Sequence, residues 1–192
     1  MQNKVIDTLL TRQSVKFVQA PGPDAKELEL IFQAAVRAPD HGKVRPWRFA
    51  IIRGENIPKL MDLGIKAAIN AGKPIAENKI EKNRRWLDKV PLVIAIACAP
   101  DATGYIREEE SKLSVAMAVM NMQTAAQSLG YHAYWSTGIG TYYDGVGEAL
   151  GFDALDYHFM GYLSIGTPIE TPEPKVRPDY KDFVRELDKL IV

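Results

Sequence analysis

The sequence predicts a single domain, residues 1–192, of the α+β or α/β class, in which a central sheet packs against one long helix. Three observations predict this class. Patterns typical of helices and strands are interleaved without a break in composition. The continuous apolar run at 92–99 is typical of a strand buried on both faces. Residues 112–129 form a helical pattern that is apolar almost all round, about 27 Å long, and we expect it to be the buried central helix.

The first half of the chain supplies three helices and one strand. Residues 2–12 carry apolar side chains with helical spacing. Asp24 and Glu27 have the spacing of a capping box, which begins a second helix. Alternating side chains predict a strand at 48–53, and a helical pattern follows at 57–71.

The second half continues the same interleaving. Residues 76–89 form a charged helix or an ordered lid. After the run at 92–99 and the long helix, Gly130 is a natural helix-ending residue. Short strands are expected at 132–136 and 159–165, with a short helix at 144–150 between them.

The C-terminal part differs in character. Residues 169–179 are rich in proline and charge. They lead into a stretch with the apolar residues Phe183, Leu187, Leu190 and Ile191. This tail is expected to pack on its own chain or to reach across to a partner subunit.

Composition excludes several function classes. The 24 Lys and Arg balance the 24 Asp and Glu, so nothing favours nucleic acid or an anionic membrane surface as a partner. The N-terminus has no apolar signal region, and no run is long enough to span a bilayer. The single cysteine, Cys98, predicts a reducing, cytoplasmic location.

Common catalytic and nucleotide motifs are absent. Residues 138–143 follow a strand but lack the third glycine of a dinucleotide fingerprint, and no phosphate-binding P-loop occurs. His41, His132 and His158 fall at no metal-ligand spacing. We therefore predict no metal site.

Two short stretches carry the chemistry instead. Arg12, Ser14 and Lys16 alternate after the first helix, so in an extended segment they would form a row suited to an anion that also carries hydroxyl groups. The alternative is that they are ordinary surface charges. The second stretch, 37–47, is a helix end that runs into a polar, cationic loop closed by Pro46 and Trp47. The alternative interpretation is that Arg37 only caps the C-terminus of its helix and that Asp40-His41 is an ordinary turn.

With these motifs in order, the chain resembles the flavin-dependent nitroreductase family, most of all its small members. The resemblance covers nearly the whole chain. The matching segments are Arg12-x-Ser14-x-Lys16, 37–41 with Pro46-Trp47-Arg48-Phe49, 116–130 with Asn121-Met122-Gln123, 134–138, 161–168 and Lys175-x-Arg177-Pro178.

The resemblance implies a nitroreductase-like α+β fold with a central, mainly antiparallel sheet flanked by helices. It also implies a homodimer with exchanged tails and an FMN at each subunit interface. Arg12, Gln13, Ser14 and Lys16 would hold the flavin from one subunit. Trp135, Ser136 and Thr137 would line its ring, and Lys175 and Arg177 would meet its phosphate. Residues 39–43, with Pro39, Asp40, Lys43 and especially His41, would approach the flavin from the other subunit. Arg37 matches a flavin contact of the small members.

The implied activity is reduction of a small electron-poor acceptor, such as a nitroaromatic or a quinone. NAD(P)H would donate hydride to the flavin in a ping-pong cycle. Lys16 would stabilise the negative charge of the reduced flavin, and no essential acid–base side chain is expected because water can supply the second proton. Two alternatives stay open: a non-enzymatic flavin-binding protein, and a relative specialised in reductive dehalogenation or ring oxidation.

Overall fold

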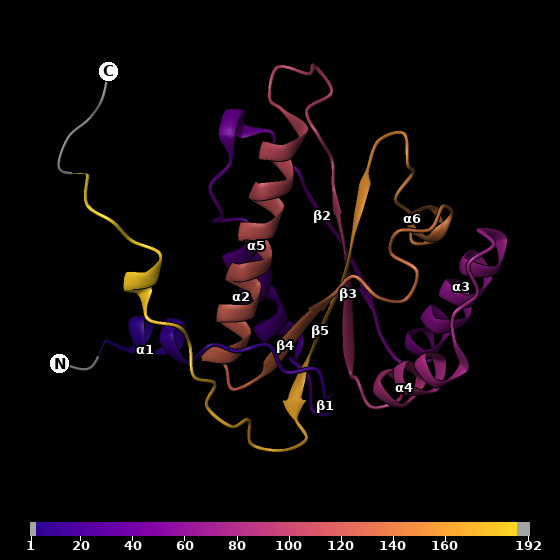
Figure 1. Ribbon diagram of the computed structural model, residues 1–192, viewed down its shortest axis with the longest axis horizontal. Helices are drawn as coiled ribbons and strands as arrows, with labels where there is room; N and C mark the ends of the chain where they lie inside the picture. Colours follow the sequence, from indigo (N-terminus) through magenta and orange to yellow (C-terminus); the bar gives the residue numbers. More distant parts are fainter. Residues whose placement is uncertain (1–2, 188–192) are drawn as a thin grey trace.

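A five-stranded sheet runs between two layers of helices in the computed structural model, which describes residues 3–187 (Figure 1). The strand order is β1-β5-β3-β2, and β4 also pairs with β5. All four pairings are antiparallel, so the α+β prediction is confirmed. The strands are β1 (Val18–Gln19), β2 (Trp47–Ile52), β3 (Leu92–Cys98), β4 (His132–Ser136) and β5 (His158–Pro168).

Helices α2 and α5 cover one face of the sheet, and α3, α4 and α6 cover the other (Figure 1). The helices are α1 (Lys4–Thr11), α2 (Ala25–Ala35), α3 (Asn56–Asn70), α4 (Glu77–Leu87), α5 (Glu108–Ser128) and α6 (Val146–Ala149). Two 3-10 turns, η1 (His41–Lys43) and η2 (Tyr180–Asp182), complete the described chain.

Strand β3 lies at the centre of the sheet, between β2 and β5, and all seven of its side chains are buried. Alternate residues supply two separate cores. Ile94 and Ile96 pack with α2 and α5, whereas Val93 and Ala95 pack with the opposite layer. The apolar run at 92–99 was correctly predicted to be a strand buried on both faces, because two helical layers sandwich it.

Helix α5 differs from its prediction in two ways. It begins one turn earlier, at Glu108. The expectation that it is buried all round is wrong: Val115, Val119 and Met122 face the sheet, but Leu113, Met117 and Met120 are exposed. One helix can cover a sheet with only one face, so the second apolar face of α5 has no cover within the described chain.

Sequence signals that depend only on neighbouring residues predicted the structure correctly. The Asp24–Glu27 capping box forms as predicted: the Asp24 carboxylate accepts from the Glu27 backbone N–H at 2.8 Å. Strand β1 was missed, because two residues are too few to show an alternating pattern. Helix α6 is shorter than the predicted 144–150, and β5 extends to Pro168, past the predicted end at 165.

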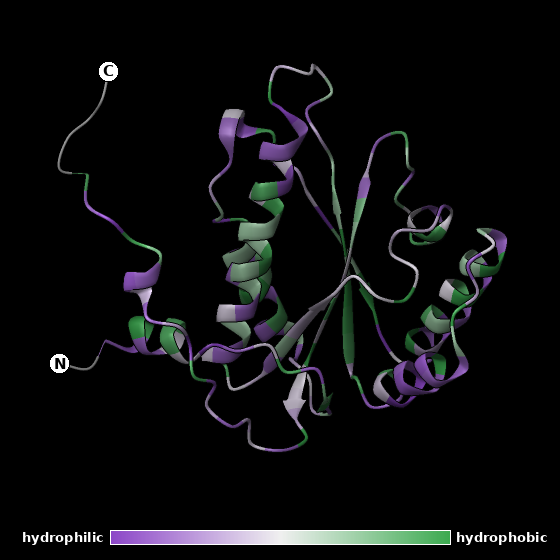
Figure 2. Cartoon of the chain, in the orientation of Figure 1, coloured by the Kyte–Doolittle hydropathy of each residue, from purple (hydrophilic) through white to green (hydrophobic). Residues whose placement is uncertain are grey.

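The tail after β5 leaves the body of the molecule and passes α1 (Figure 1). Five of its apolar side chains, Val176, Tyr180, Phe183, Val184 and Leu187, are exposed. Leu190 and Ile191 of the predicted apolar stretch lie outside the described residues. Hydrophobic residues are also uncovered on α1, where Val5, Ile6, Leu9 and Leu10 are exposed (Figure 2).

Candidate functional site

The segment that follows α1 is extended and lies beside β4. The Val15 backbone N–H donates to the carbonyl of Ala133 at 3.1 Å. The buried Gln13 donates through Nε2 to the carbonyl of Glu173 at 3.1 Å, which holds the first part of the tail against this segment. The local fold therefore brings two sequence-predicted groups together, because the N-terminal cations and the Lys175–Arg177 tail meet here.

These groups line a cleft of about 280 Å³ between α1, α5 and the tail. The lining residues that carry charge or hydrogen-bonding groups are Thr11, Arg12, Gln13, Gln127, His132, Lys175 and Arg177. Partial burial, and then the nearby charge of Arg177, lower the pKa of Arg12. Like charges held close together repel, so an anion between them would relieve a cost that the protein otherwise carries.

Three residues that line this cleft each have a buried polar atom without a hydrogen-bond partner: Oε1 of Gln13, Oε1 of Gln127 and Nδ1 of His132. Two of these residues use their amide nitrogen elsewhere, since Gln127 donates to Thr11 at 3.0 Å and Gln13 donates to Glu173. Unpaired buried acceptors beside three cations suit a ligand that has both an anionic group and hydroxyl donors.

The predicted cation–hydroxyl–cation row does not form as a row. The Arg12 guanidinium donates to Oε1 of Gln123 on α5 at 3.0 Å. Lys16 instead turns toward α4, where its Nζ lies 3.4 Å from Oδ1 of Asn83 and 4.7 Å from the centre of the Trp86 ring. The two cations therefore contact helices on opposite faces of the sheet, Arg12 on α5 and Lys16 on α4. Ser14 between them is exposed.

Sequence reasoning missed these helical partners. Asn83 is a buried polar residue on the apolar stripe that Ile80 and Leu87 define on α4. A polar amide on a buried stripe is a usable signal, because such a group needs a partner. Burial, and then the charge of Lys82, lower the pKa of Lys16.

A second groove, of about 530 Å³, runs between residues 13–17 and 169–175.

The other predicted cation cluster lies at the far end of α5. Asp40 accepts through Oδ2 from the Arg45 backbone N–H at 2.9 Å, and His41 pairs through Nδ1 with Glu110 of α5. Arg37, Pro39 and Lys43 belong to the same loop and are exposed.

One chain does not bring the two groups of predicted residues together. Gln123, which contacts Arg12, and Glu110, which contacts His41, are 13 positions apart on the same helix. At 1.5 Å per residue, this separation is about 20 Å along α5. Within one chain, the two groups therefore contact α5 at opposite ends.

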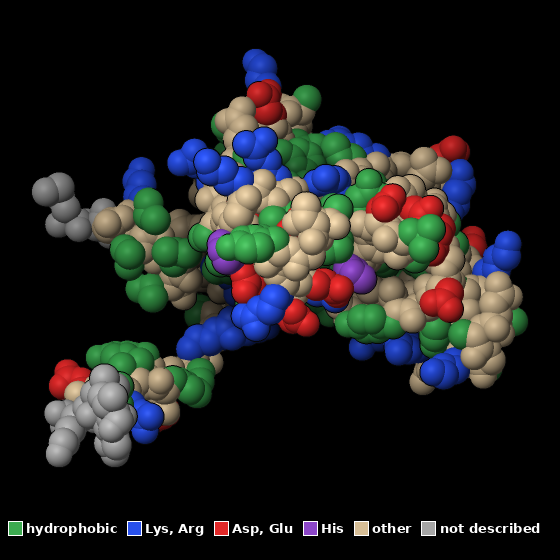
Figure 3. All heavy atoms as spheres, turned by 90° about the horizontal axis from the view of Figure 1, so that it is seen from above, with side chains coloured by type: hydrophobic (Ala, Val, Ile, Leu, Met, Phe, Trp, Pro, Cys, Tyr) green, Lys and Arg blue, Asp and Glu red, His purple; other side chains and the backbone are tan. Residues whose placement is uncertain are grey.

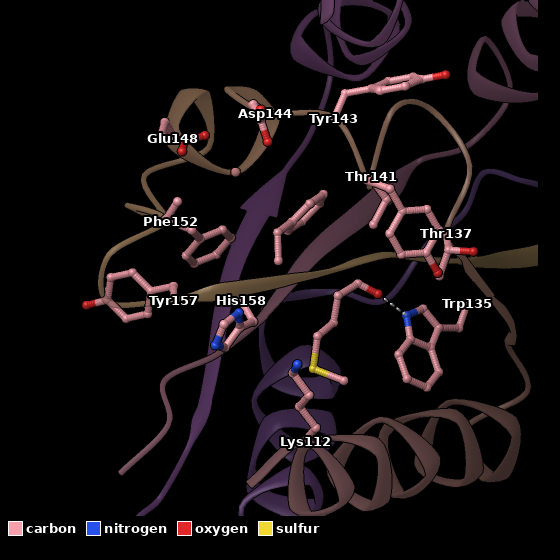
Figure 4. A pocket seen from close by; sticks show the side chains of 15 residues that line it. Lys112, Trp135, Thr137, Thr141, Tyr143, Asp144, Glu148, Phe152, Tyr157 and His158 are labelled. Atoms are coloured by element: carbon pink, nitrogen blue, oxygen red, sulfur yellow. Dashed lines mark hydrogen bonds between the residues drawn. The ribbon is translucent and has the colours of Figure 1, made fainter. Parts of the chain in front are cut away.

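The predicted ring-lining residues lie at the end of β4, where two of them, Trp135 and Thr137, border a cavity of about 560 Å³ (Figure 4). Trp135 donates through Nε1 to the carbonyl of Met160 at 3.0 Å, and the Ser136 hydroxyl accepts from the Gly138 backbone N–H at 3.1 Å. Trp135 and Thr137 line the cavity, which opens where β4 stops and leaves the edge of β5 unpaired.

The cavity has an aromatic wall and charged margins. Its rings come from Trp135, Tyr142, Tyr143, Phe152, Tyr157 and Phe159. Lys112 and His158 stand together at one side, where both pair with Glu108, and Asp144 and Glu148 lie at the other (Figure 4). The bond from Lys112 is the main cause that lowers the pKa of Glu108. This arrangement suits a flat ring with polar substituents.

Among residues 3–187, no group of three or more His, Cys, Asp or Glu side chains has an arrangement that could hold a metal ion. Within the same range, no helix combines the length and hydrophobicity that crossing a bilayer requires.

The fold and the clefts define an α+β protein with a cleft lined by cations at one end of its long helix and an aromatic cavity at the end of a neighbouring strand. The sequence model described as the nitroreductase family matches residues 9–167, most of the chain. The chain belongs to the nitroreductase family and is accordingly an oxidoreductase.

Individual relatives agree with this assignment. A Haemophilus influenzae protein named as an NAD(P)H nitroreductase is 36% identical over 181 residues, which cover 93% of this chain and 97% of the relative. The crystal structure of a Bacillus cereus nitroreductase-like family protein has a TM-score of 0.81 at 20% identity and covers 98% of each chain. A Desulfovibrio desulfuricans nitroreductase in complex with FMN has a TM-score of 0.75 at 20% identity, over 97% of this chain and 99% of that one. The last two show likeness of fold.

Proposed function

We propose that this protein is an FMN-dependent oxidoreductase that uses NAD(P)H to reduce small electron-poor acceptors such as nitroaromatics and quinones. The observation that carries the proposal is the cleft lined by Arg12, Lys175 and Arg177, whose other lining residues Gln13, Gln127 and His132 each have a buried polar atom without a hydrogen-bond partner. FMN offers both matching groups, a phosphate for the cations and ribityl hydroxyls for the acceptors. The Haemophilus relative's name and the FMN in the Desulfovibrio structure support it.

Different residues would contact different parts of the cofactor. Arg12, Lys175 and Arg177 would hold the phosphate, and Gln13 and Ser14 would meet the ribityl chain. Lys16 would keep a positive charge beside the isoalloxazine ring, with Asn83 and Trp86 fixing its amine. The strand end at Trp135, Ser136 and Thr137 would line the ring.

The remaining predicted contacts, Arg37, Pro39, Asp40, His41 and Lys43, would come from the partner subunit of a homodimer. Three features support a dimer: the separation of about 20 Å between the two residue groups, the apolar stripe left exposed on α5, and the exposed apolar tail. Exposed apolar surface on this scale is typical of an interface.

When bound, FMN supplies the redox chemistry, by accepting hydride from NAD(P)H and passing it to the acceptor in a ping-pong cycle. The protein's part is positional and electrostatic. Lys16 would stabilise negative charge on the reduced ring, and the aromatic cavity beside Trp135 would receive the flat acceptor. Water can deliver the last proton, so no side chain is assigned as an acid or a base.

The test is the visible spectrum of the purified protein, with FMN added to saturation, under nitrogen. We expect a bound flavin whose absorbance bleaches on addition of NADH or NADPH and returns when a quinone or a nitroaromatic is added. A protein that binds no flavin would contradict the proposal. A protein that binds flavin but does not bleach would instead support a non-enzymatic flavin-binding role.

Activity confined to a halogenated or a saturated ring substrate would support the specialised dehalogenation or ring-oxidation alternative.

Two further expectations stay predictions. One is the cytoplasmic location, which rests on the single buried Cys98, and the other is that residues 1–192 form one domain.

A further inference from the structure

The loop that carries His41 is fixed to the first turn of α5. Gly42 has a φ of +69°, and a Cβ atom there would lie 2.8 Å from Cγ1 of the buried Ile106. Lys43 and Arg45 also have positive φ values, 56° and 52°. Non-glycine residues rarely adopt this conformation, and such strain persists only where surrounding contacts hold it.

One of those contacts is internal to the loop. The Asp40 carboxylate accepts the backbone N–H of Arg45, so its charge is engaged within the turn rather than directed at a ligand. The sequence places the Asp40 carboxylate close to the proposed flavin, and this contact occupies that carboxylate within the loop. The side chain of His41 is 66% exposed.

Glu110 holds that side chain. Its Oε2 contacts Nδ1 of His41, and its Oε1 accepts from Nε of Arg107 at 3.0 Å. The bonds from His41 and then from Arg107 lower the pKa of Glu110, so the group is ionised at neutral pH. An ionised carboxylate can only accept hydrogen bonds, so Nδ1 of His41 carries a proton and Nε2 is the nitrogen that faces outward.

We propose that Glu110 is a positioning residue that fixes the ring orientation and the Nδ1–H form of His41, so that Nε2 of His41 meets the flavin held by the partner subunit. This inference rests on the proposed function. It gives a role to one carboxylate of the acidic run 108–110 that opens α5, beyond the favourable placement of negative charge at a helix N-terminus. A carboxylate behind a histidine commonly sets which ring nitrogen reaches the ligand.

The same helical turn provides a matched control. Glu109 lies between two histidine-holding carboxylates but is itself exposed. Figure 3, which views this end of the molecule, shows histidine side chains beside acidic and basic ones. A Glu109→Gln variant removes the same charge from the same turn without touching His41.

The experiment is a double-mutant cycle on FMN affinity. Glu110→Gln should weaken FMN binding by roughly 3- to 10-fold, the effect of one modest hydrogen bond. In a His41→Ala background, Glu110→Gln should cause no further loss, because the carboxylate acts through the ring. Glu110→Asp should restore part of the affinity, and Glu109→Gln should leave it unchanged.

Several results would overturn the inference. Equal losses from Glu110→Gln with and without His41 would show a general structural role for the carboxylate. A His41→Ala variant with unchanged FMN affinity would remove His41 from the site while leaving the proposed function intact. Failure of the unmodified protein to bind FMN would instead reject the proposed function and the inference with it.

A second measurement does not depend on how the variants fold. Nitrogen NMR of the unmodified protein with FMN bound should place a proton on Nδ1 of His41. A neutral ring with its proton on Nε2 alone would contradict the proposal directly.

Discussion

Arg12 is a partly buried cation in the cleft between α1, α5 and the tail, and it lies close to a second cation, Arg177. Replacing Arg12 by alanine removes a charge-assisted hydrogen bond to the proposed phosphate. We expect Arg12→Ala to weaken FMN binding about 10- to 100-fold. Flavin retention after dilution and gel filtration measures the effect.

Riboflavin, which lacks the phosphate, should bind Arg12→Ala and the unmodified protein equally well. Arg53→Ala removes an exposed arginine beyond the end of β2 and serves as the control. A similar loss of FMN from both variants, or a loss of riboflavin affinity in Arg12→Ala, would show that Arg12 does not act on the phosphate.

A second prediction at the scale of single residues concerns Cys98. Burial raises the pKa of its thiol to about 11, whereas an unfolded cysteine titrates near ~8.5. The folded state therefore holds the proton more tightly, and the stabilisation is complete below about pH 8.5 and is lost as the pH rises toward 11. Compared with Cys98→Ala, the unmodified protein should lose about 2 kcal/mol of relative unfolding free energy between pH 7 and 10.5.

Urea unfolding of both proteins at each pH gives this difference. The comparison cancels the titration of lysines and tyrosines, which both proteins share. A difference that stayed constant from pH 7 to 10.5 would mean that the folded thiol ionises as freely as the unfolded one.

At the scale of elements, α5 carries two apolar faces and uses one of them on the sheet. Its second face, Leu113, Met117 and Met120, has the spacing of a single helical stripe. A charge placed on this stripe would be buried in the proposed dimer interface. We expect Met117→Lys to shift the protein from dimer toward a 21.4 kDa monomer in light scattering, and to reduce FMN binding in parallel.

Ile69→Lys is the matched control, since Ile69 is an exposed apolar residue on α3, in the opposite layer. It should leave both the mass and the flavin content unchanged. A Met117→Lys protein that remained dimeric, or that became monomeric and kept stoichiometric FMN, would contradict the role assigned to this face of α5.

At the scale of the whole molecule, the distance between the Arg12 cleft and the His41 loop makes each proposed site a shared one. Arg12→Ala and His41→Ala would each weaken both sites of their own homodimer. In a mixed dimer, the mutations fall together in one site and the other site is intact. Mixing the two proteins after subunit exchange should therefore restore about a quarter of the tight FMN sites.

The control mixture is Arg12→Ala with Lys16→Ala, because both residues belong to the same half of a site and every mixed site would stay defective. Equilibrium FMN titration before and after exchange measures the recovery. Recovery in both mixtures, or in neither, would contradict a site built from two chains.

The elements were predictable because their signals are local. The uniform apolar character of β3 follows from two flanking layers, and the Asp24–Glu27 cap depends on residues three apart. The candidate site was predictable only in part. Its residues could be named from motif order, but their contacts could not. Gln123 lies in a matching motif that says nothing of Arg12, Asn83 lies in no motif, and the two are 111 and 67 positions away from the cations that they contact.

The sequence by itself determined most helices and strands, the apolar strand at the centre of the sheet and the identity of the cationic segments, because periodicity, capping and charge are properties of neighbouring residues. Only the tertiary structure decided that Arg12 and Lys16 contact helices of opposite layers, that Glu110 holds His41, and that the two halves of the proposed site lie at opposite ends of α5. Those facts depend on how distant segments pack, and packing is set by the whole chain at once rather than by any stretch of it.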